Sequence, residues 1–320
     1  MRSVSGVVIE LSAVIVALSD DAPTILLVPS EDVGAQGLPF GPFDPVGDRT
    51  LEEGLRRGVV QQAGLTLGYA EQLYTFGDRF RDPQERSGGP RPVSVGYLAL
   101  ARQGDDAPSP RESWTDWYRF LPWEDWRGGT PGLIDSVIVP RLEAWCAAAT
   151  SKAEQQRRRD RTHLTFALGD ATWDNERVLE RYELLYEAQL VAESARDQGK
   201  PLLGVATGTP LAKDHRRILA TAMGRLRAKI KYRPVIFELM PPAFTLLQLQ
   251  RAAEALAGGR LHKQNFRRLV AHEGLVEPTG QISVQTGGRP AELFRFRRGV
   301  VLERPAPGVR LPVKRGGKSS

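Results

Sequence analysis

The side chains best suited to chemistry gather in one segment of the chain, between positions 48 and 57. Its six charged residues are Asp48, Arg49, Glu52, Glu53, Arg56 and Arg57. Neighbouring carboxylates can ligate a divalent cation, and the planar guanidinium group of arginine suits phosphate. The acids can equally offset the dipole at the start of a helix, with the arginines paired to Glu52 and Glu53 on the same helix face. We favour this second interpretation of the acids.

The same segment keeps the frame of a catalytic helix without its acids. Residues 55–65, LRRGVVQQAGL, follow the spacing of the second half of the Nudix box, R-E-U-x-E-E-x-G-U, where U is a bulky aliphatic residue. The acidic positions of that pattern fall on Gly58, Gln61 and Gln62. Nudix hydrolases hold Mg²⁺ against a pyrophosphate with these glutamates, whereas glycine offers no ligand and glutamine only a neutral oxygen. We therefore expect no catalytic residue, no metal site and no catalytic cofactor.

An enzyme remains the alternative interpretation. In that case the chain would hydrolyse ADP-ribose or NAD with Asp48, Glu52 and Glu53 as displaced metal ligands. Turnover of ADP-ribose above a no-protein control would support it.

A small α/β domain is expected to position these residues. Apolar runs bounded by turn residues predict strands over residues 6–18, 23–28, 72–80 and 91–102. Thr50 and Glu53 form a capping box that starts a helix, and Gly64 ends it. The Gly- and Pro-rich residues 34–48 are expected to be an irregular loop. This first domain should span residues 1–148.

A second group of ligand candidates follows the helix in the stretch YTFGDRFR. The group comprises Tyr74, Phe76, Asp78, Arg79 and Arg81. Tyr74 and Phe76 alternate on one strand face, which favours core packing over stacking on an adenine ring. The predicted ligand-binding residues are this group together with Arg49, Arg56 and Arg57.

Charge divides the chain into two unlike parts. Residues 213–320 hold 22 Lys and Arg against 7 Asp and Glu, a net charge of +15. Residues 1–212 hold 22 against 31, a net charge of −9. A strongly basic part suggests a polyanion partner. The alternative is a solvated basic surface, but such a surface would not require the DNA-binding motif that the same part contains.

A winged helix-turn-helix domain is predicted over residues 213–304. Its first helix is expected at residues 214–232, with Arg216 and Arg217 off the apolar row as candidate phosphate contacts. Thr245 and Gln248 form a capping box for a second helix. That helix should end at the glycine pair 258–259.

The third helix of this domain, within residues 262–276, is expected to read DNA. Phe266, Leu269 and Val270 share the i, i+3, i+4 spacing of a buried face. The predicted contacts on the exposed side are Lys263, Gln264, Asn265, Arg267 and Arg268. Arginine and lysine suit guanine, glutamine suits adenine, and all of them suit backbone oxygens. For Asn265 a local hydrogen bond is an equal alternative.

A hairpin with a Gly-Gly tip follows the third helix and should form the wing. Arg289 beside the tip could enter a minor groove, since narrow grooves attract arginine. Residues 305–320 are expected to be a disordered basic tail. The alternative for the whole part is a three-helix domain with a solvated charged face.

Residues 149–212, between the two domains, should form a linker and a helical connector. A helical apolar stripe includes Tyr182, Leu185 and Tyr186, which we take as a candidate dimer seam. Packing within the chain explains the same stripe equally well. Cys146 is the single cysteine, which excludes an internal disulfide and fits a reducing cytoplasm. We find no uncharged apolar run near the ~20 residues of a membrane span, so we expect no membrane partner.

Several motifs together resemble the Nudix-related regulators of NAD metabolism of the NrtR type. They include QLYTFGDRFRDP, RPVSVGYLAL, HKQNFRRLV and GGRPAELFRFR. The stretches LERYELLYEAQLV and FTLLQLQRAAEALAGGRLHKQNF look closer to the NadQ branch, repressors of genes for de novo NAD synthesis. The resemblance implies a cytoplasmic bacterial repressor, active as a homodimer on a palindromic operator. It also implies a Nudix-like α/β/α sandwich that senses an effector nucleotide such as NAD, ATP or ADP-ribose.

Overall fold

The computed structural model describes most of the chain of 320 residues. The described residues are 6–19, 21–30, 35–79, 82, 85, 88–102, 114–200, 207–283, 290–303 and 308–309. Within them, no helix is long and apolar enough to cross a membrane.

A mixed sheet forms the centre of the N-terminal part, with the strand order β6-β7-β1-β2-β8 and with β5 paired to β1. The central strands β1 (Val7–Ser19) and β7 (Arg91–Leu100) run parallel, and the other pairs of this sheet are antiparallel. The remaining strands are β2 (Ala22–Leu26), β5 (Phe40–Pro42), β6 (Tyr69–Phe76) and β8 (Trp114–Asp116). A separate short ribbon pairs β3 (Val28–Pro29) with β4 (Gln36–Gly37). Residues 13–17 of β1 are fully buried because helices cover both faces of the sheet.

Helix α1 (Leu51–Ala63) covers one face of the sheet. Its boundaries are the predicted ones: the Thr50 side chain accepts from the Glu53 backbone N–H, and Gly64 ends the helix at φ 64°. Only this half of the predicted capping box of Thr50 and Glu53 is formed. Leu55 and Val59 are its buried residues with large side chains, and they pack with Leu11 of β1. The polar side chains of the helix therefore point away from the core.

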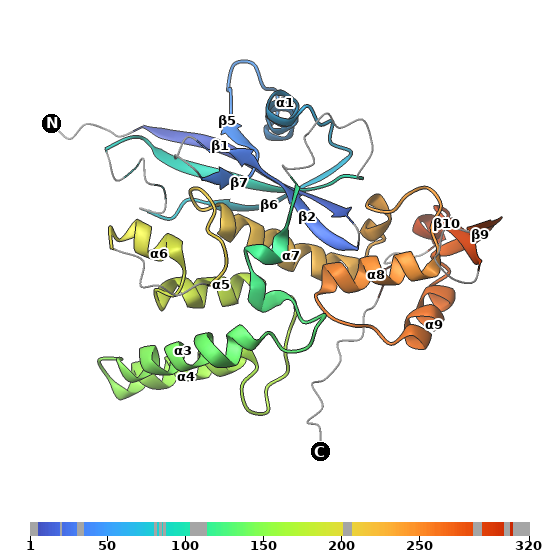
Figure 1. Cartoon of the computed structure of the whole chain (residues 1–320). Coiled ribbons are helices and arrows are strands. Elements are labelled where there is room, and N and C mark those ends of the chain that lie inside the picture. The colour runs from blue at the N-terminus through green and yellow to red at the C-terminus, as the bar shows by residue number, and fades with distance from the viewer. Residues whose placement is uncertain are drawn as a thin grey trace.

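Helix α7 (His215–Ile230) covers the opposite face of the sheet, below it in Figure 1. Ile218 lies so close to β7 that a Cβ on Gly96 would be 3.1 Å from its side chain. The predicted boundary at residue 213 was wrong in this respect: the helix expected to open the DNA-binding domain completes the α/β/α sandwich. An amphipathic pattern predicts that a helix packs, but not against which partner.

A largely helical layer, formed by the last part of the predicted first domain together with the predicted connector, lies beside the sandwich. It comprises η2 (Trp117–Arg119), η3 (Pro122–Glu124), the π-helix η4 (Ile134–Ile138), α3 (Val139–Ala147), α4 (Lys152–Phe166), α5 (Val178–Glu187) and α6 (Ala192–Asp197). Tyr182 and Leu185 of α5 are fully buried within the chain, and the Tyr186 hydroxyl donates to Asp197 at 2.8 Å. The proposed dimer seam at these residues was wrong, because α5 packs against α7 of the same chain.

The C-terminal part has the elements of a winged helix, on the right of Figure 1. They are η5 (Val235–Glu238), α8 (Leu246–Ala257), α9 (Lys263–Glu273), the antiparallel pair β9 (Val276–Ser283) and β10 (Ala291–Phe296), and α10 (Val300–Glu303). The reciprocal capping box of Thr245 and Gln248 is present as predicted. In the predicted disordered tail, Val309 is buried and donates its N–H to the Ile230 carbonyl; residues 305–307 and 310–320 lie outside the described residues.

Candidate functional site

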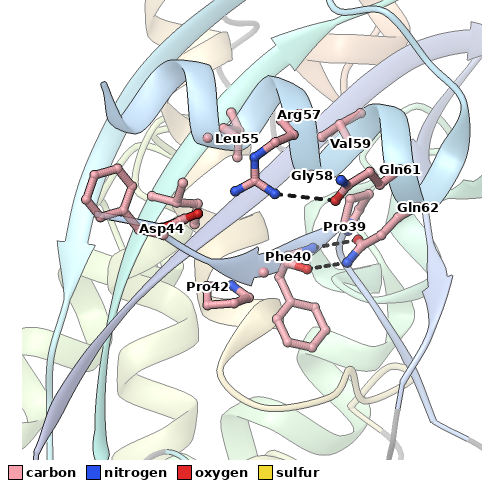
Figure 2. Close-up of a pocket in the computed structure, with 14 residues that line it drawn as sticks. Pro39, Phe40, Pro42, Asp44, Leu55, Arg57, Gly58, Val59, Gln61 and Gln62 are labelled. Carbon is pink, nitrogen blue, oxygen red and sulfur yellow. Dashed lines mark hydrogen bonds between the residues drawn. The ribbon is translucent and has the colours of Figure 1, made fainter. Parts of the chain in front are cut away.

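A cavity of about 260 Å³ lies between α1 and strand β5, on the face of α1 that carries the altered acidic positions. Figure 2 shows Arg57, Gly58, Gln61 and Gln62 on its helix side. Its other wall comes from the loop predicted to be irregular, through Pro39, Phe40, Pro42, Phe43 and Asp44. Neither the types nor the spacing of these wall residues singled them out, apart from their nearness to the helix.

Gln62 makes a two-way contact that only an amide can make. Its Oε1 accepts from the Phe40 backbone N–H at 3.1 Å, and its Nε2 donates to the Phe40 carbonyl oxygen (Figure 2). A carboxylate has no donor, so it would face the Phe40 carbonyl with like partial charge. The glutamine at this acidic position of the box therefore fastens β5 to α1.

Arg57 and Asp48 form a second fixed contact beside the cavity. The guanidinium group donates through Nε and Nη2 to both carboxylate oxygens of Asp48 at 2.8 Å. The hydrogen bond from Arg57 and a second one from the Asp44 backbone N–H hold the pKa of Asp48 below its usual range. Gly54 makes room for this pair, since a Cβ there would lie 2.5 Å from Asp48 Oδ2. Arg57 also reaches Gln61 Oε1, at 3.4 Å.

The other predicted ligand residues do not meet at this cavity. Arg56 pairs with Glu52 at 2.8 Å and donates to the Gly68 carbonyl at 3.0 Å. Arg49 is exposed at the start of the helix. Among the predicted ligand residues that the structure describes, only Arg57 lines the cavity.

The stretch 74–79 lies toward the opposite face of the sheet. Phe76 is buried under α7, as the core interpretation predicted, and the Arg217 guanidinium lies 5.2 Å from its ring centre. Tyr74 is 59% exposed, so the prediction of core packing was wrong for this residue. Tyr74 lies within a register irregularity of β6, between Gln72 and Thr75, which interrupts the regular alternation of the strand. Asp78 pairs with Arg217. Arg79 lies 3.7 Å from Glu85, and Arg81 falls outside the described residues.

Helix α9 presents the predicted recognition face to solvent. Phe266 and Val270 are buried, and Lys263, Gln264, Asn265, Arg267 and Arg268 are exposed. Arg268 donates to Asn265 Oδ1 at 3.3 Å, so the local hydrogen bond considered for Asn265 is present. Lys263, Gln264 and Arg267 make no side-chain hydrogen bond or ion pair with any described residue.

The two arginines predicted to contact phosphate are engaged elsewhere. Arg216 is fully buried, pairs with Glu193 and donates to the Thr207 carbonyl at 2.7 Å. Arg217 pairs with Asp78, Glu183 and Asp214. Their position off the apolar row predicted exposure, but α7 is covered on several sides. The structure thus overturns Arg216 as a DNA contact and leaves Arg217 engaged by carboxylates; Arg289 lies outside the described residues.

Comparisons with known proteins match this arrangement. Residues 236–296 match the family described as the NrtR DNA-binding winged helix domain. Over 86 residues the chain is 44% identical to the "ADPR responsive transcriptional repressor NtrR" of Acinetobacter baylyi, a match that spans 27% of this chain and only 34% of that relative.

Solved structures extend the likeness to the whole fold. The crystal structure of Shewanella oneidensis NrtR complexed with a 27mer DNA has a TM-score of 0.53 at 22% identity, covering 95% of this chain and 99% of that chain. A second structure of Shewanella oneidensis NrtR has a TM-score of 0.50 at 23% identity, covering 91% and 95%. The predicted architecture, an α/β/α sandwich followed by a helical connector and a winged helix domain, is confirmed. The family match begins after α7, in agreement with the packing of that helix on the sheet.

Proposed function

We propose that this chain, an NrtR-like protein that joins a Nudix-like domain to a winged helix domain, is a DNA-binding transcriptional repressor. The observation that carries the proposal is the recognition face of α9. Lys263, Gln264 and Arg267 are exposed and have no partner among the described residues, so they are available to bases and phosphates. Arg268 and Asn265 extend the same face.

A homodimer on a palindromic operator is the proposed assembly. One winged helix offers a small interface, so specific repression requires two copies on one face of the duplex, about one helical turn or a multiple apart. Because Tyr182 and Leu185 of α5 are buried within the chain, we place the seam elsewhere on the chain. Light scattering at micromolar concentration should report a dimer; a monomer that still binds its operator tightly would refute this assembly.

The proposed effector is an adenine nucleotide, and ADP-ribose is favoured over NAD and ATP. The name of the relative from Acinetobacter baylyi supports this choice. We place the ligand at the cavity between α1 and β5, where the exposed part of Arg57 can meet a phosphate. Arg49, Arg56 and the stretch 74–81 remain secondary candidates, because their described members lie outside this cavity.

The chemistry of the altered box helix supports sensing without hydrolysis. Gly58, Gln61 and Gln62 line the cavity without a charge that could hold Mg²⁺. Of the displaced acids in the enzyme alternative, Asp48 is held by Arg57 and Glu52 by Arg56. These pairings disfavour a hydrolase. The target genes we propose are those of NAD biosynthesis, from the resemblance to NrtR- and NadQ-type repressors.

Selection from a randomised duplex library by the full chain tests the DNA function. We expect an inverted repeat to be enriched by the parent but not by a Lys263→Ala/Arg267→Ala double variant. No enrichment by the folded parent would contradict the function.

Thermal shift with ADP-ribose, NAD and ATP tests the effector, since a specific ligand stabilises the fold by mass action. Product analysis of the same mixtures with Mg²⁺ should show only background hydrolysis. Turnover well above a no-protein control would instead support the hydrolase alternative.

A further inference from the structure

A buried charge cluster joins the connector to α7. The Glu124 carboxylate of η3 accepts from Arg181 of α5 at 2.5 and 3.0 Å and from Arg227 of α7 at 2.6 Å. All three side chains are fully buried. Burial would raise the pKa of Glu124, but the two guanidinium groups hold that pKa below its usual range. One carboxylate thus fixes two helices through charged hydrogen bonds.

The same cluster reaches into the winged helix. Arg227 Nε donates to the Leu256 carbonyl at 3.1 Å, and its Nη2 donates to the Tyr118 hydroxyl at 3.3 Å. The Tyr118 hydroxyl in turn donates to the Ala255 carbonyl at 2.7 Å. These carbonyls belong to the last turn of α8, where helical hydrogen bonds run out and a positive charge is favoured. Side chains from η2 and α7 therefore cap the C-terminus of α8.

The turn that follows α8 is fitted tightly to the backbone of η3. Gly258 has φ 73°, and a Cβ there would lie 2.4 Å from the Glu124 carbonyl oxygen and 2.6 Å from Arg227 Nη2. The Gly258 carbonyl accepts from the Trp126 N–H at 2.7 Å, and Arg260 donates to the Arg127 carbonyl at 3.0 Å. This turn leads directly into α9, so its docking sets the direction of the recognition helix.

A buried ion cluster is weak evidence for stability, because desolvation offsets much of the attraction; its better-attested use is to fix one arrangement among several. From this geometry we propose that Glu124 is a positioning residue for DNA recognition: through Arg227 it holds the α8–α9 turn against η3 and α7. Because α7 also packs on the sheet of the proposed sensor domain, this contact couples the effector to α9. The coupling to effector and DNA rests on the proposed function. The docking itself does not.

The test compares full-length variants that loosen this contact by different routes. Glu124→Gln removes the charge that orients both arginines. Gly258→Ala places a methyl group against the η3 backbone. Its matched control is Gly274→Ala, which ends α9 with a similar φ of 58° but would meet only the Arg297 side chain, at 3.3 Å. Tyr118→Phe removes a single hydroxyl group. This milder variant tests the same contact if the stronger variants fail to fold.

Amide hydrogen exchange across residues 258–261 reads the docking without any ligand. We expect at least about tenfold faster exchange in Glu124→Gln and Gly258→Ala than in Gly274→Ala, and about threefold in Tyr118→Phe. Parent-like exchange in the folded Glu124→Gln and Gly258→Ala variants would overturn the docking claim. It would do so even if the chain bound no DNA.

Binding to the selected duplex reads the coupling. The ratio of duplex affinities with and without ADP-ribose should move toward one in Glu124→Gln, whereas the affinity for ADP-ribose alone should stay within about twofold. An unchanged ratio in a folded variant with faster exchange would overturn the coupling. If the parent itself shows no selected duplex or no response to ADP-ribose, the proposed function fails and only the docking claim survives.

Discussion

Helices α1 and α9 both carry basic and amide side chains at helical spacing, yet they use them in opposite ways. On α1, Arg56 and Arg57 pair with Glu52 and Asp48. On α9, Lys263, Gln264 and Arg267 meet no described partner. The same residue types therefore stabilise the fold in one helix and remain available to a partner in the other. Charge alone does not identify a binding surface; the presence or absence of an internal partner is what separates these two helices.

The largest expected effect comes from breaking a buried pair. Arg216→Met leaves Glu193 as an unpaired buried carboxylate and should lower the free energy of unfolding by about 3–5 kcal/mol. Chemical denaturation measures it, with exposed Arg267→Ala as the control, expected within about 0.5 kcal/mol of the parent. A stable Arg216→Met variant with weakened DNA binding would show that Arg216 belongs with the free arginines after all.

Removing a free arginine should change binding and not stability. Arg267→Ala should weaken binding to the selected duplex by roughly 1–3 kcal/mol, with relaxed specificity at one position if Arg267 reads a base. If it contacts phosphate, the loss should extend to all duplexes and the salt slope should fall by about one unit. Arg217→Ala is the matched control on α7, because Arg217 is already paired. If the folded Arg267→Ala variant bound DNA like the parent, the recognition face would have to lie elsewhere.

The pH dependence of stability probes the packing of α7 on the sandwich. Burial lowers the pKa of His215 to about 3, and its Nδ1 accepts from the Leu38 N–H at 3.1 Å. The folded pKa lies below the unfolded value, so this contribution is complete above about pH 6.5 and is lost as pH falls toward 3. Between pH 7 and pH 5 the loss should be about 2 kcal/mol. His215→Asn keeps a hydrogen-bond acceptor for the Leu38 N–H and should flatten the dependence of stability on pH. An equally steep loss of stability in this variant would show that other groups cause the pH dependence.

The smallest expected effect separates the two glutamines of the box. Gln62→Glu loses the donor to the Phe40 carbonyl and should destabilise the fold by roughly 0.5–1.5 kcal/mol. Gln61→Glu places a negative charge near Arg57 and should change the stability of the fold very little. Thermal unfolding of the two variants at pH 7 compares them directly. Equal destabilisation would mean that the amide clamp on β5 is not the reason for glutamine at position 62.

The sequence predicted most of the local structure for identifiable reasons. Thr50 and Thr245 mark helix starts through their own side-chain oxygens, and Gly64 and Gly258 end helices in the left-handed conformation. The buried row of α9 also followed from spacing, through Phe266 and Val270. Each of these signals acts within a few residues, so a single segment is enough to read it.

Long-range pairing was not readable in the same way. Arg216 and Arg217 look like exposed basic residues because Glu193 and Asp78, their partners, lie elsewhere in the sequence. The packing of α7 on the sheet and the burial of Tyr182 within the chain were missed for the same reason. An apolar stripe predicts that a helix has a packing partner but does not identify that partner. The Phe40 wall of the cavity was missed because residues 34–48 were predicted to be an irregular loop, whereas Phe40 begins strand β5, which pairs with β1. Its contact with Gln62 joins this strand to a helix 22 residues away.

Fluorescence anisotropy of the parent with the selected duplex and a scrambled duplex, each with and without ADP-ribose, tests the central claim most directly. At physiological salt we expect the selected duplex to bind about 10³-fold or more tightly than the scrambled one. ADP-ribose should change the affinity for the selected duplex while remaining intact in the mixture. Equal binding of both duplexes, or consumption of ADP-ribose by the protein, would contradict a regulator that reads DNA through α9 and senses a nucleotide without cleaving it.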